Sequence, residues 1–209
     1  MKSEVPVADP ALRAEHVAKA YRRHIVLRDV SFAASAGALI GIVGENGAGK
    51  STLLKILAGE LAPSSGRVSR SGALGYCPQE VILNESLTVR QHIDYFRAAY
   101  QLADVRRAQE VMALLRFERY ADMRVDTLSG GTKQKLNLTL AVMRDPRVLL
   151  LDEPYQGFDW ETYLRFWELA EDLRARGCAV IVISHLVFDQ KRFDRLYALA
   201  GGVIEAVSA

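Results

Sequence analysis

The fold is decided by Gly44-Glu45-Asn46-Gly47-Ala48-Gly49-Lys50-Ser51-Thr52, a stretch that lies between an apolar run and a helical pattern. Residues 39–43 predict a buried strand, and residues 50–58 predict a helix. Glycines let backbone N–H groups close around phosphate oxygens, and the N-terminus of the following helix adds positive potential. We therefore predict a triphosphate site in which Lys50 reaches the β- and γ-phosphates and Ser51 coordinates Mg²⁺. The alternative is a glycine-rich turn that arises by chance.

A second motif places two carboxylates after a buried strand. Residues 148–151 are all apolar, which is typical of a buried parallel strand, and Asp152 and Glu153 follow directly. Successive strand residues point in opposite directions, so the two acids can take separate roles. Asp152 can hold Mg²⁺ through its water shell, and Glu153 can act as general base on an attacking water. The alternative is a strand end with two solvated acids, which the neighbouring phosphate loop disfavours.

Composition indicates a globular protein and excludes several classes. Of the 209 residues, 50% are apolar and 25% are charged, and the net charge is +2, so we expect no nucleic-acid partner. A membrane span needs about 20 apolar residues, and the longest apolar runs have about six. Cys77 and Cys178 stand far apart and form no metal-type pair, which favours a reducing cytoplasm. We expect a loose tail over 1–10, without a signal peptide, and one domain over 11–209.

The chain alternates between strand-rich and helical parts. Helices are predicted over 88–100, 105–115 and 131–144, and Thr88 with Gln91 resembles a capping box. The region 88–145 is therefore expected to form a helical subdomain. A further helix over 160–176 is predicted to carry one apolar face, formed by Trp160, Tyr163, Leu164, Trp167, Ala170 and Leu173. Strands are predicted over 15–21, 25–32, near 67–68, 73–77, 179–183 and near 203–205, and the alternation indicates a parallel sheet covered by helices.

The stretch Leu128-Ser129-Gly130-Gly131, here called the LSGG segment, directly precedes a predicted helix. Together with the phosphate loop and the paired acids, it resembles the ABC-type ATPases, the nucleotide-binding units of ATP-binding-cassette transporters. The resemblance covers about 13–205. A hydroxyl and two glycines at a helix start form an anion site, although an ordinary serine N-cap is the alternative. One phosphate loop and a second anion site suggest that two chains pack head to tail, with Ser129, Gly130 and Gly131 of one chain touching the γ-phosphate held by the other.

The resemblance implies an α/β fold of the P-loop NTPase type, with a mainly parallel central sheet, an N-terminal antiparallel β subdomain and an inserted α-helical subdomain. It implies that Gln79 contacts Mg²⁺ and the attacking water, and that His185 hydrogen-bonds the γ-phosphate. It matches Tyr21 to the aromatic residue that stacks on adenine and Asp159 to a residue that crosses the dimer interface. A half-buried strand tyrosine, a loop glutamine and a helix N-cap remain the alternatives for Tyr21, Gln79 and Asp159. The remaining histidines match nothing in the family and are expected at the surface: His16, His24 and His92.

The predicted site is therefore an ATP and Mg²⁺ site. The metal ligands are Ser51, Gln79 and Asp152, and the catalytic residues are Glu153, Gln79 and His185. The nucleotide-binding residues are Tyr21, Gly44, Asn46, Gly47, Ala48, Gly49, Lys50, Ser51, Thr52 and, from the LSGG segment, Ser129, Gly130 and Gly131.

Two stretches depart from the common family pattern. Thr132-Lys133-Gln134-Lys135 resembles the branch that exports drugs and polysaccharides, often with separately encoded membrane subunits. The loop Tyr155-Gln156-Gly157-Phe158-Asp159-Trp160 carries bulky residues where the family has small ones, which puts the detailed dimer contact in doubt but not the ATP site.

The resemblance implies an ATP-hydrolysing subunit that powers transport through separate transmembrane permease subunits, and Thr132-Lys133-Gln134 favours export over import. It would dimerise with itself or with a related cassette, and it would be cytoplasmic and peripheral on the inner face of the membrane. Two alternatives stay open at this point: a soluble ABC-type switch that acts on a nucleic-acid or protein complex, and a small-molecule kinase or GTPase.

Overall fold

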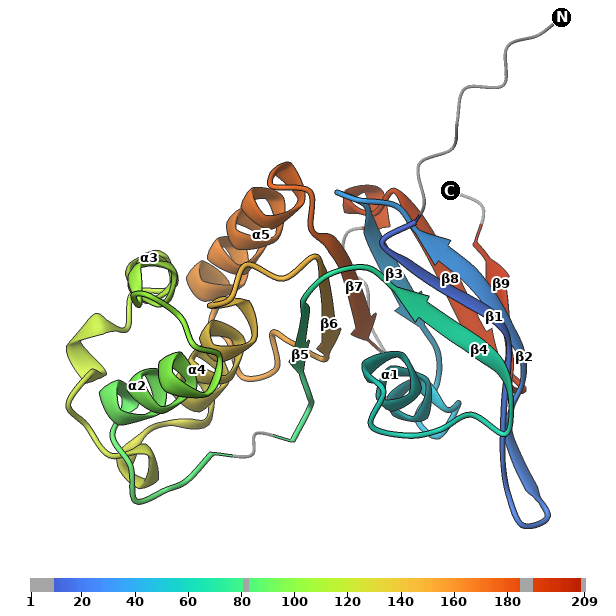
Figure 1. Cartoon of the computed structure of the whole chain (residues 1–209), viewed down its shortest axis with the longest axis horizontal. Coiled ribbons are helices and arrows are strands. Elements are labelled where there is room, and N and C mark those ends of the chain that lie inside the picture. Colours follow the sequence, from blue (N-terminus) through green and yellow to red (C-terminus); the bar gives the residue numbers. More distant parts are fainter. Residues whose placement is uncertain (1–9, 81–82, 185–189, 208–209) are drawn as a thin grey trace, which may run out of the picture.

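The computed structural model describes residues 10–80, 83–184 and 190–207. Its described strands form one nine-stranded sheet in the order β4-β1-β2-β9-β8-β3-β7-β6-β5 (Figure 1). The strands are β1 (Leu12–Tyr21), β2 (His24–Ala34), β3 (Leu39–Val43), β4 (Ser65–Arg70), β5 (Leu74–Cys77), β6 (Val148–Asp152), β7 (Ala179–Ser184), β8 (Arg195–Ala200) and β9 (Val203–Ala206).

Five neighbouring strands, β8, β3, β7, β6 and β5, pair in parallel and form the central part of the sheet. Every residue of β6 and β7 is buried, as their apolar runs predict. The register pairs Val43 with Ser184 and Asp152 with Ile183. Because parallel strands end at one edge of a sheet, the residues that follow β3, β5 and β6 meet there.

The antiparallel part lies at the other side of the sheet, where β1 pairs with both β2 and β4. A parallel bridge between Asp29 and Val203 connects it to β9. This arrangement confirms the expected N-terminal antiparallel β region.

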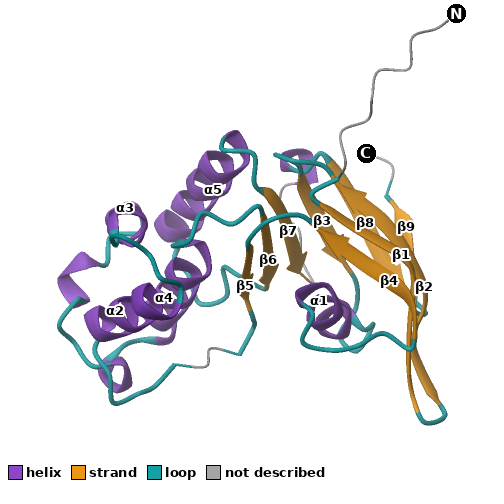
Figure 2. Ribbon diagram, viewed as in Figure 1, coloured by secondary structure: helices purple, strands orange, loops and turns teal. Residues whose placement is uncertain are grey.

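The helices are α1 (Lys50–Ala58), α2 (Val89–Ala99), α3 (Arg106–Leu114), α4 (Gly130–Val142) and α5 (Trp160–Ala175). Figure 2 shows α2, α3 and α4 together on the side of the molecule away from the antiparallel strands. Thr88 and Gln91 form the predicted capping box of α2. Among the described residues, no helix is both long enough and apolar enough to cross a lipid bilayer.

A buried arginine joins the helical region to α5. The Arg107 side chain of α3 is only 9% exposed, and its Nη2 lies 2.7 Å from Asp172 Oδ2 of α5. Its Nη1 lies 3.1 Å from Glu110 Oε2 on its own helix. A buried guanidinium needs such carboxylate partners, because the loss of its hydration is costly. The ion pair therefore fixes α3 against α5.

Three details of the sequence prediction are wrong. Strand β8 was not predicted, and it forms a hairpin with β9. Helix α5 buries Trp167, Ala170 and Leu173 of the predicted face, but it leaves Trp160 and Leu164 exposed and also buries Phe166 and Leu169. This helix carries apolar residues on two overlapping faces with helical spacing, so periodicity alone identifies only part of the buried face.

The third error concerns His92, which is 3% exposed and not at the surface. Its Nε2 accepts a hydrogen bond from the Asn84 backbone N–H at 3.1 Å, and its Nδ1 lies 3.0 Å from the Thr88 carbonyl oxygen. The ring is buried because the loop before α2 folds back over it, which no local pattern reveals.

Candidate functional site

The phosphate loop, residues 44–52, connects β3 to α1 as predicted. Gly47 and Gly49 have φ values of 84° and 100°, in the left-handed region that favours glycine. A Cβ atom at Gly49 would also lie 2.9 Å from Val26 Cγ1. Lys50 is 8% exposed, and its Nζ donates hydrogen bonds to the carbonyl oxygens of Gly44 at 2.6 Å and Glu45 at 2.9 Å. The lysine ammonium is therefore held over the loop.

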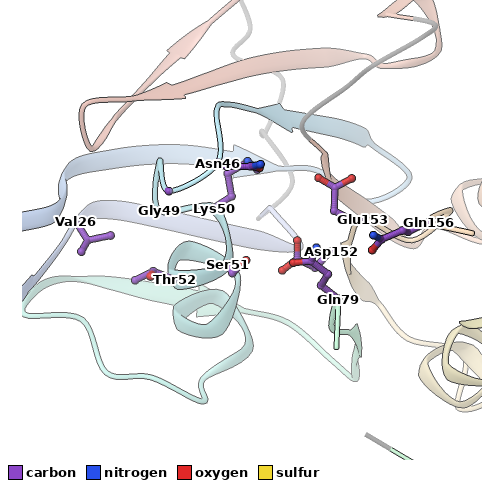
Figure 3. Close-up of a pocket in the computed structure, with 11 residues that line it drawn as sticks. Val26, Asn46, Gly49, Lys50, Ser51, Thr52, Gln79, Asp152, Glu153 and Gln156 are labelled. Atoms are coloured by element: carbon purple, nitrogen blue, oxygen red, sulfur yellow. The ribbon is translucent and has the colours of Figure 1, made fainter. Parts of the chain in front are cut away.

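A cavity of about 480 Å³ opens beside this loop (Figure 3). It receives residues from the loop and α1, from the ends of β5 and β6, and from β2. Its lining consists of Val26, Asn46, Gly47, Gly49, Lys50, Ser51, Thr52, Gln79, Asp152, Glu153 and Gln156. Most of the predicted nucleotide, metal and catalytic residues are thus brought to one cavity.

Asp152 and Ser51 have the chemistry of a magnesium site. Asp152 is 3% exposed, and burial raises the pKa of its carboxyl, while a hydrogen bond with the Ser51 side chain works in the opposite direction. Gln79 lines the same cavity. Mg²⁺ prefers hydroxyl, carboxylate, amide and water oxygens, so this donor set fits the ion.

Glu153 occupies a strained backbone position at the exit of β6. Its φ is 49°, its exposed fraction is 7%, and its backbone N–H donates to the Ile183 carbonyl oxygen at 2.9 Å. The Ser184 hydroxyl donates to Glu153 Oε2 at 2.9 Å. In Figure 3 the Asp152 carboxylate lies towards Ser51, while the Glu153 carboxylate is carried away from it. The two neighbouring acids are thus separated, as the strand alternation predicts.

Some predicted residues do not reach the cavity. Tyr21 is 48% exposed and does not line it, so its contact with adenine stays a prediction. Gly44 and Ala48 shape the loop instead of lining the cavity, and a Cβ at Gly44 would lie 2.5 Å from the Leu199 carbonyl oxygen. His185 lies outside the described residues.

Sequence reasoning missed Val26 and Gln156 as lining residues. Gln156 follows the paired acids by three residues, so its place in their loop was an available signal. Val26 comes from the antiparallel region, and no motif marks it.

The LSGG segment lies outside the phosphate-loop cavity. Ser129 caps α4, accepting a hydrogen bond from the Thr132 N–H at 3.2 Å. A Cβ at Gly131 would lie 2.6 Å from the Gly157 carbonyl oxygen, whereas a Cβ at Gly130 would meet nothing within 4 Å. A smaller cavity of about 210 Å³ contains Ser129 and Gly131 together with Asp159 and Lys135. The N-cap interpretation of Ser129 is therefore confirmed, and a second role in trans stays a prediction.

Sequence comparison supplies relatives of known type. Residues 27–156 match the model of the family described as ABC transporter. The chain is 34% identical over 208 residues to Nod factor export ATP-binding protein I of Neorhizobium galegae, covering 92% of this chain and 60% of that protein. It is 33% identical over 181 residues to the glucosylceramide transporter ABCA12 of Mus musculus, covering 79% of this chain and 7% of that protein. The chain thus spans less than two thirds of the length of these relatives.

Solved structures agree with the fold. A structure of the ATP-binding subunit of an ABC transporter superposes with a TM-score of 0.89 at 26% identity, covering 95% of this chain and 90% of that one. A dimeric structure of a bacterial ABC transporter cassette superposes with a TM-score of 0.84 at 23% identity, covering 95% and 99%. With the phosphate loop, the paired acids and the LSGG segment in their expected places, the chain belongs to the ABC transporter family.

Proposed function

We propose that this chain binds and hydrolyses ATP as the energy-supplying subunit of an ABC exporter. The observation that carries the proposal is the phosphate-loop cavity, where Lys50, Ser51, Asp152 and Glu153 line one space. A kinase would also need a second substrate site, and it would give no reason for the LSGG segment. The family assignment favours the transporter over a soluble switch.

ATP binding would use the loop amides and the Lys50 ammonium, which would exchange its two carbonyl partners for phosphate oxygens. Ser51, Asp152 and Gln79 would hold Mg²⁺, and the bound ion would neutralise charge on the phosphates. The burial of Asp152 and Lys50 excludes water from both groups, which strengthens their interactions with charged ligands.

In the proposed hydrolysis, Glu153 accepts a proton from a water whose oxygen attacks the γ-phosphorus. The bond between that phosphorus and the β–γ bridging oxygen breaks, and ADP and phosphate leave. Gln79 lines the cavity near the acids and would orient the water. The contact of His185 with the γ-phosphate is carried over from the family.

A second chain would complete the site. Ser129, Gly130 and Gly131 sit at a helix N-terminus outside the phosphate-loop cavity, so they would contact a γ-phosphate held by another copy or by a related cassette. The dimeric cassette among the similar structures supports this arrangement.

Transport would take place in separate membrane-spanning subunits, which would hold this chain at the inner face of the membrane. Export is supported by the Thr132-Lys133-Gln134 variant and by the names of the relatives, which include Nod factor export ATP-binding protein I. The net charge of +2 gives no electrostatic reason for a nucleic-acid partner.

The test is Glu153→Gln, with Glu168→Gln, an exposed glutamate of α5, as the matched control. We expect E153Q to lose hydrolysis by at least about 100-fold, while it still binds ATP and accumulates as an ATP-dependent dimer in light scattering. Wild-type turnover in E153Q would exclude Glu153 as the base. Purification of the tagged chain from gently solubilised membranes tests the transport role: a co-purifying polytopic protein supports it, and exclusively ribosomal, DNA-bound or other soluble partners contradict it.

A further inference from the structure

Helix α4 carries two buried side-chain amides, Gln134 and Asn137, here called the α4 amides. They are 4% and 8% exposed, although asparagine and glutamine are found mostly at protein surfaces. Because they are three residues apart, they lie on one face of the helix, and Figure 1 shows α4 next to β5. Burying an amide costs free energy unless it is hydrogen-bonded, so the partners of these two groups define what the face is for.

Asn137 holds the main chain that leads into Gln79. Its Nδ2 donates to the Pro78 carbonyl oxygen at 3.2 Å and also lies 3.2 Å from Cys77 Sγ. Cys77 is the last residue of β5 and is completely buried. Pro78 directly precedes Gln79, which lines the phosphate-loop cavity. The peptide that connects β5 to the cavity glutamine is therefore fixed by a side chain of α4.

Gln134 holds the turn that follows Glu153. Its Nε2 donates to the Pro154 carbonyl oxygen at 3.3 Å. The Gln156 N–H donates to the Glu153 carbonyl oxygen at 3.1 Å, so Pro154 lies inside a closed turn. Proline has no N–H, and its carbonyl is the one main-chain group through which the turn can be held at this residue. The bond stands directly beside a glutamate whose φ of 49° must be maintained by its surroundings.

The helix that carries the α4 amides begins with the LSGG segment. Gly130 is its first residue, and Gln134 follows one turn later on the same face. A hydrogen-bonded helix keeps these positions at fixed distances from one another. One rigid element thus connects the surface that a second chain would contact with the main chain beside Gln79 and Glu153.

We propose that the α4 amides are positioning residues for hydrolysis: they hold Gln79 and Glu153 in place relative to the LSGG segment, so that contact with a second chain aligns both residues on the attacking water. The inference rests on the proposed function, because it takes Glu153 as the general base. Neither amide touches nucleotide or water in this scheme. They act on the main chain, and a displacement of about 1 Å at a reacting group can lower a rate about 100-fold.

The experiment compares Asn137→Leu and Gln134→Met, which remove an amide and keep a similar size, with Thr139→Val. Thr139 is completely buried on the same helix, but its hydroxyl donates to the Lys135 carbonyl oxygen of that helix at 2.8 Å. For N137L and Q134M we expect kcat for ATP to fall about tenfold, with KM and ATP affinity close to wild type. T139V should keep the wild-type kcat. A wild-type kcat in either amide variant would overturn the role of that residue, and an equal loss in T139V would overturn both roles.

ATP-dependent dimerisation separates positioning from a general disturbance of α4. Light scattering is measured with each amide variant combined with E153Q, the variant that is expected to accumulate as a dimer. N137L and Q134M should leave the ATP concentration needed for dimerisation unchanged, because the LSGG segment itself is intact. Loss of the dimer together with hydrolysis would contradict the proposal.

A double-mutant cycle with Gln79→Ala tests the route of the effect. If Asn137 acts through Gln79, then N137L added to Q79A lowers kcat no further, whereas additive losses would contradict this route. E153Q alone separates the inference from the proposed function. If E153Q hydrolyses ATP normally, the assignment of the base fails, whereas an inactive E153Q with fully active N137L and Q134M overturns the role of the α4 amides alone.

Discussion

The phosphate-loop cavity and the LSGG segment are both built at a helix N-terminus, but they differ in how far one chain completes them. In the cavity, strand ends carry Asp152 and Glu153 to the same place as Lys50, and all three are less than 10% exposed. At the LSGG segment, Ser129 and Gly130 are exposed, and a Cβ at Gly130 would meet only open space. The charged groups of the first are brought together by the fold of one chain, and the second is open to solvent, where the proposed second chain would contact it.

The difference shows that a clear sequence motif does not by itself form a complete binding site. Both segments have glycine-rich sequences and charged side chains beside them. The charged groups at the phosphate loop are buried, whereas Lys135 is only partly buried and Asp159 is exposed beside the LSGG segment. The LSGG segment supplies backbone N–H groups and one hydroxyl, which bind an anion only when something else brings that anion to them. Breaking each segment should therefore give different defects.

The largest effect is expected for Lys50→Ala. The ammonium is the buried positive charge among the residues that line the cavity, so its loss should weaken ATP binding by about 100-fold or more. Lys55→Ala, at an exposed position later in α1, is the control and should bind ATP as the wild type does. Calorimetry or a fluorescent nucleotide measures both affinities. Tight binding of ATP by K50A would show that the phosphate-loop cavity is not the ATP site.

An intermediate effect is expected for Gly130→Ala, which should leave the folded chain and its ATP affinity intact. It should lower hydrolysis about tenfold or more, because the new methyl group would face the second chain of the proposed dimer. Gly131→Ala should also lower stability, by about 1–3 kcal/mol, since its methyl group would lie 2.6 Å from the Gly157 carbonyl oxygen. Thermal melts and steady-state turnover distinguish the two. If G130A hydrolyses ATP like the wild type, the LSGG segment does not meet a nucleotide in trans.

The smallest effect is expected for Asp159→Ala. Asp159 Oδ1 accepts a hydrogen bond from the Thr162 N–H at 2.7 Å and caps α5, so the substitution should cost about 1 kcal/mol of stability, whereas Asp159→Asn keeps the cap. That backbone bond lowers the pKa of Asp159 from its ordinary value of 3.8. Its contribution is present above the unfolded-state pKa and is lost as the pH falls through the folded-state pKa. The wild type should therefore lose stability relative to D159N in strong acid, and parallel melting curves at all pH values would contradict this.

Much of the fold could be predicted because its strongest signals are local. The buried runs of β3, β6 and β7, the capping box of α2 and the glycine-rich loop each depend on neighbouring residues only. Strand β8 also had an available local signal, because Gly201-Gly202 is a typical two-residue hairpin turn and both glycines have positive φ. The burial of His92 had none, since it depends on a loop that closes over the ring.

The residues of the candidate site also fall into two groups: those that a local motif predicts and those that only the folded sheet brings together. Lys50, Ser51, Asp152 and Glu153 belong to contiguous motifs, and all four line the same cavity. Val26 and Ser184 reach the site from separate strands, so only the folded sheet brings them to it. From the sequence, Tyr155 is only a bulky residue in the loop after the paired acids. Its packing on α5 is evident only in the folded structure.

Helix α5 also forms a rigid connection between two parts of the molecule. It is a rod of 16 residues, about 24 Å long, and rigid over that length. Near one end it is clamped to α3 by the Arg107–Asp172 ion pair, and near the other it supports the Tyr155 ring. A displacement of α3 would therefore be passed along this rigid helix to the neighbourhood of Glu153.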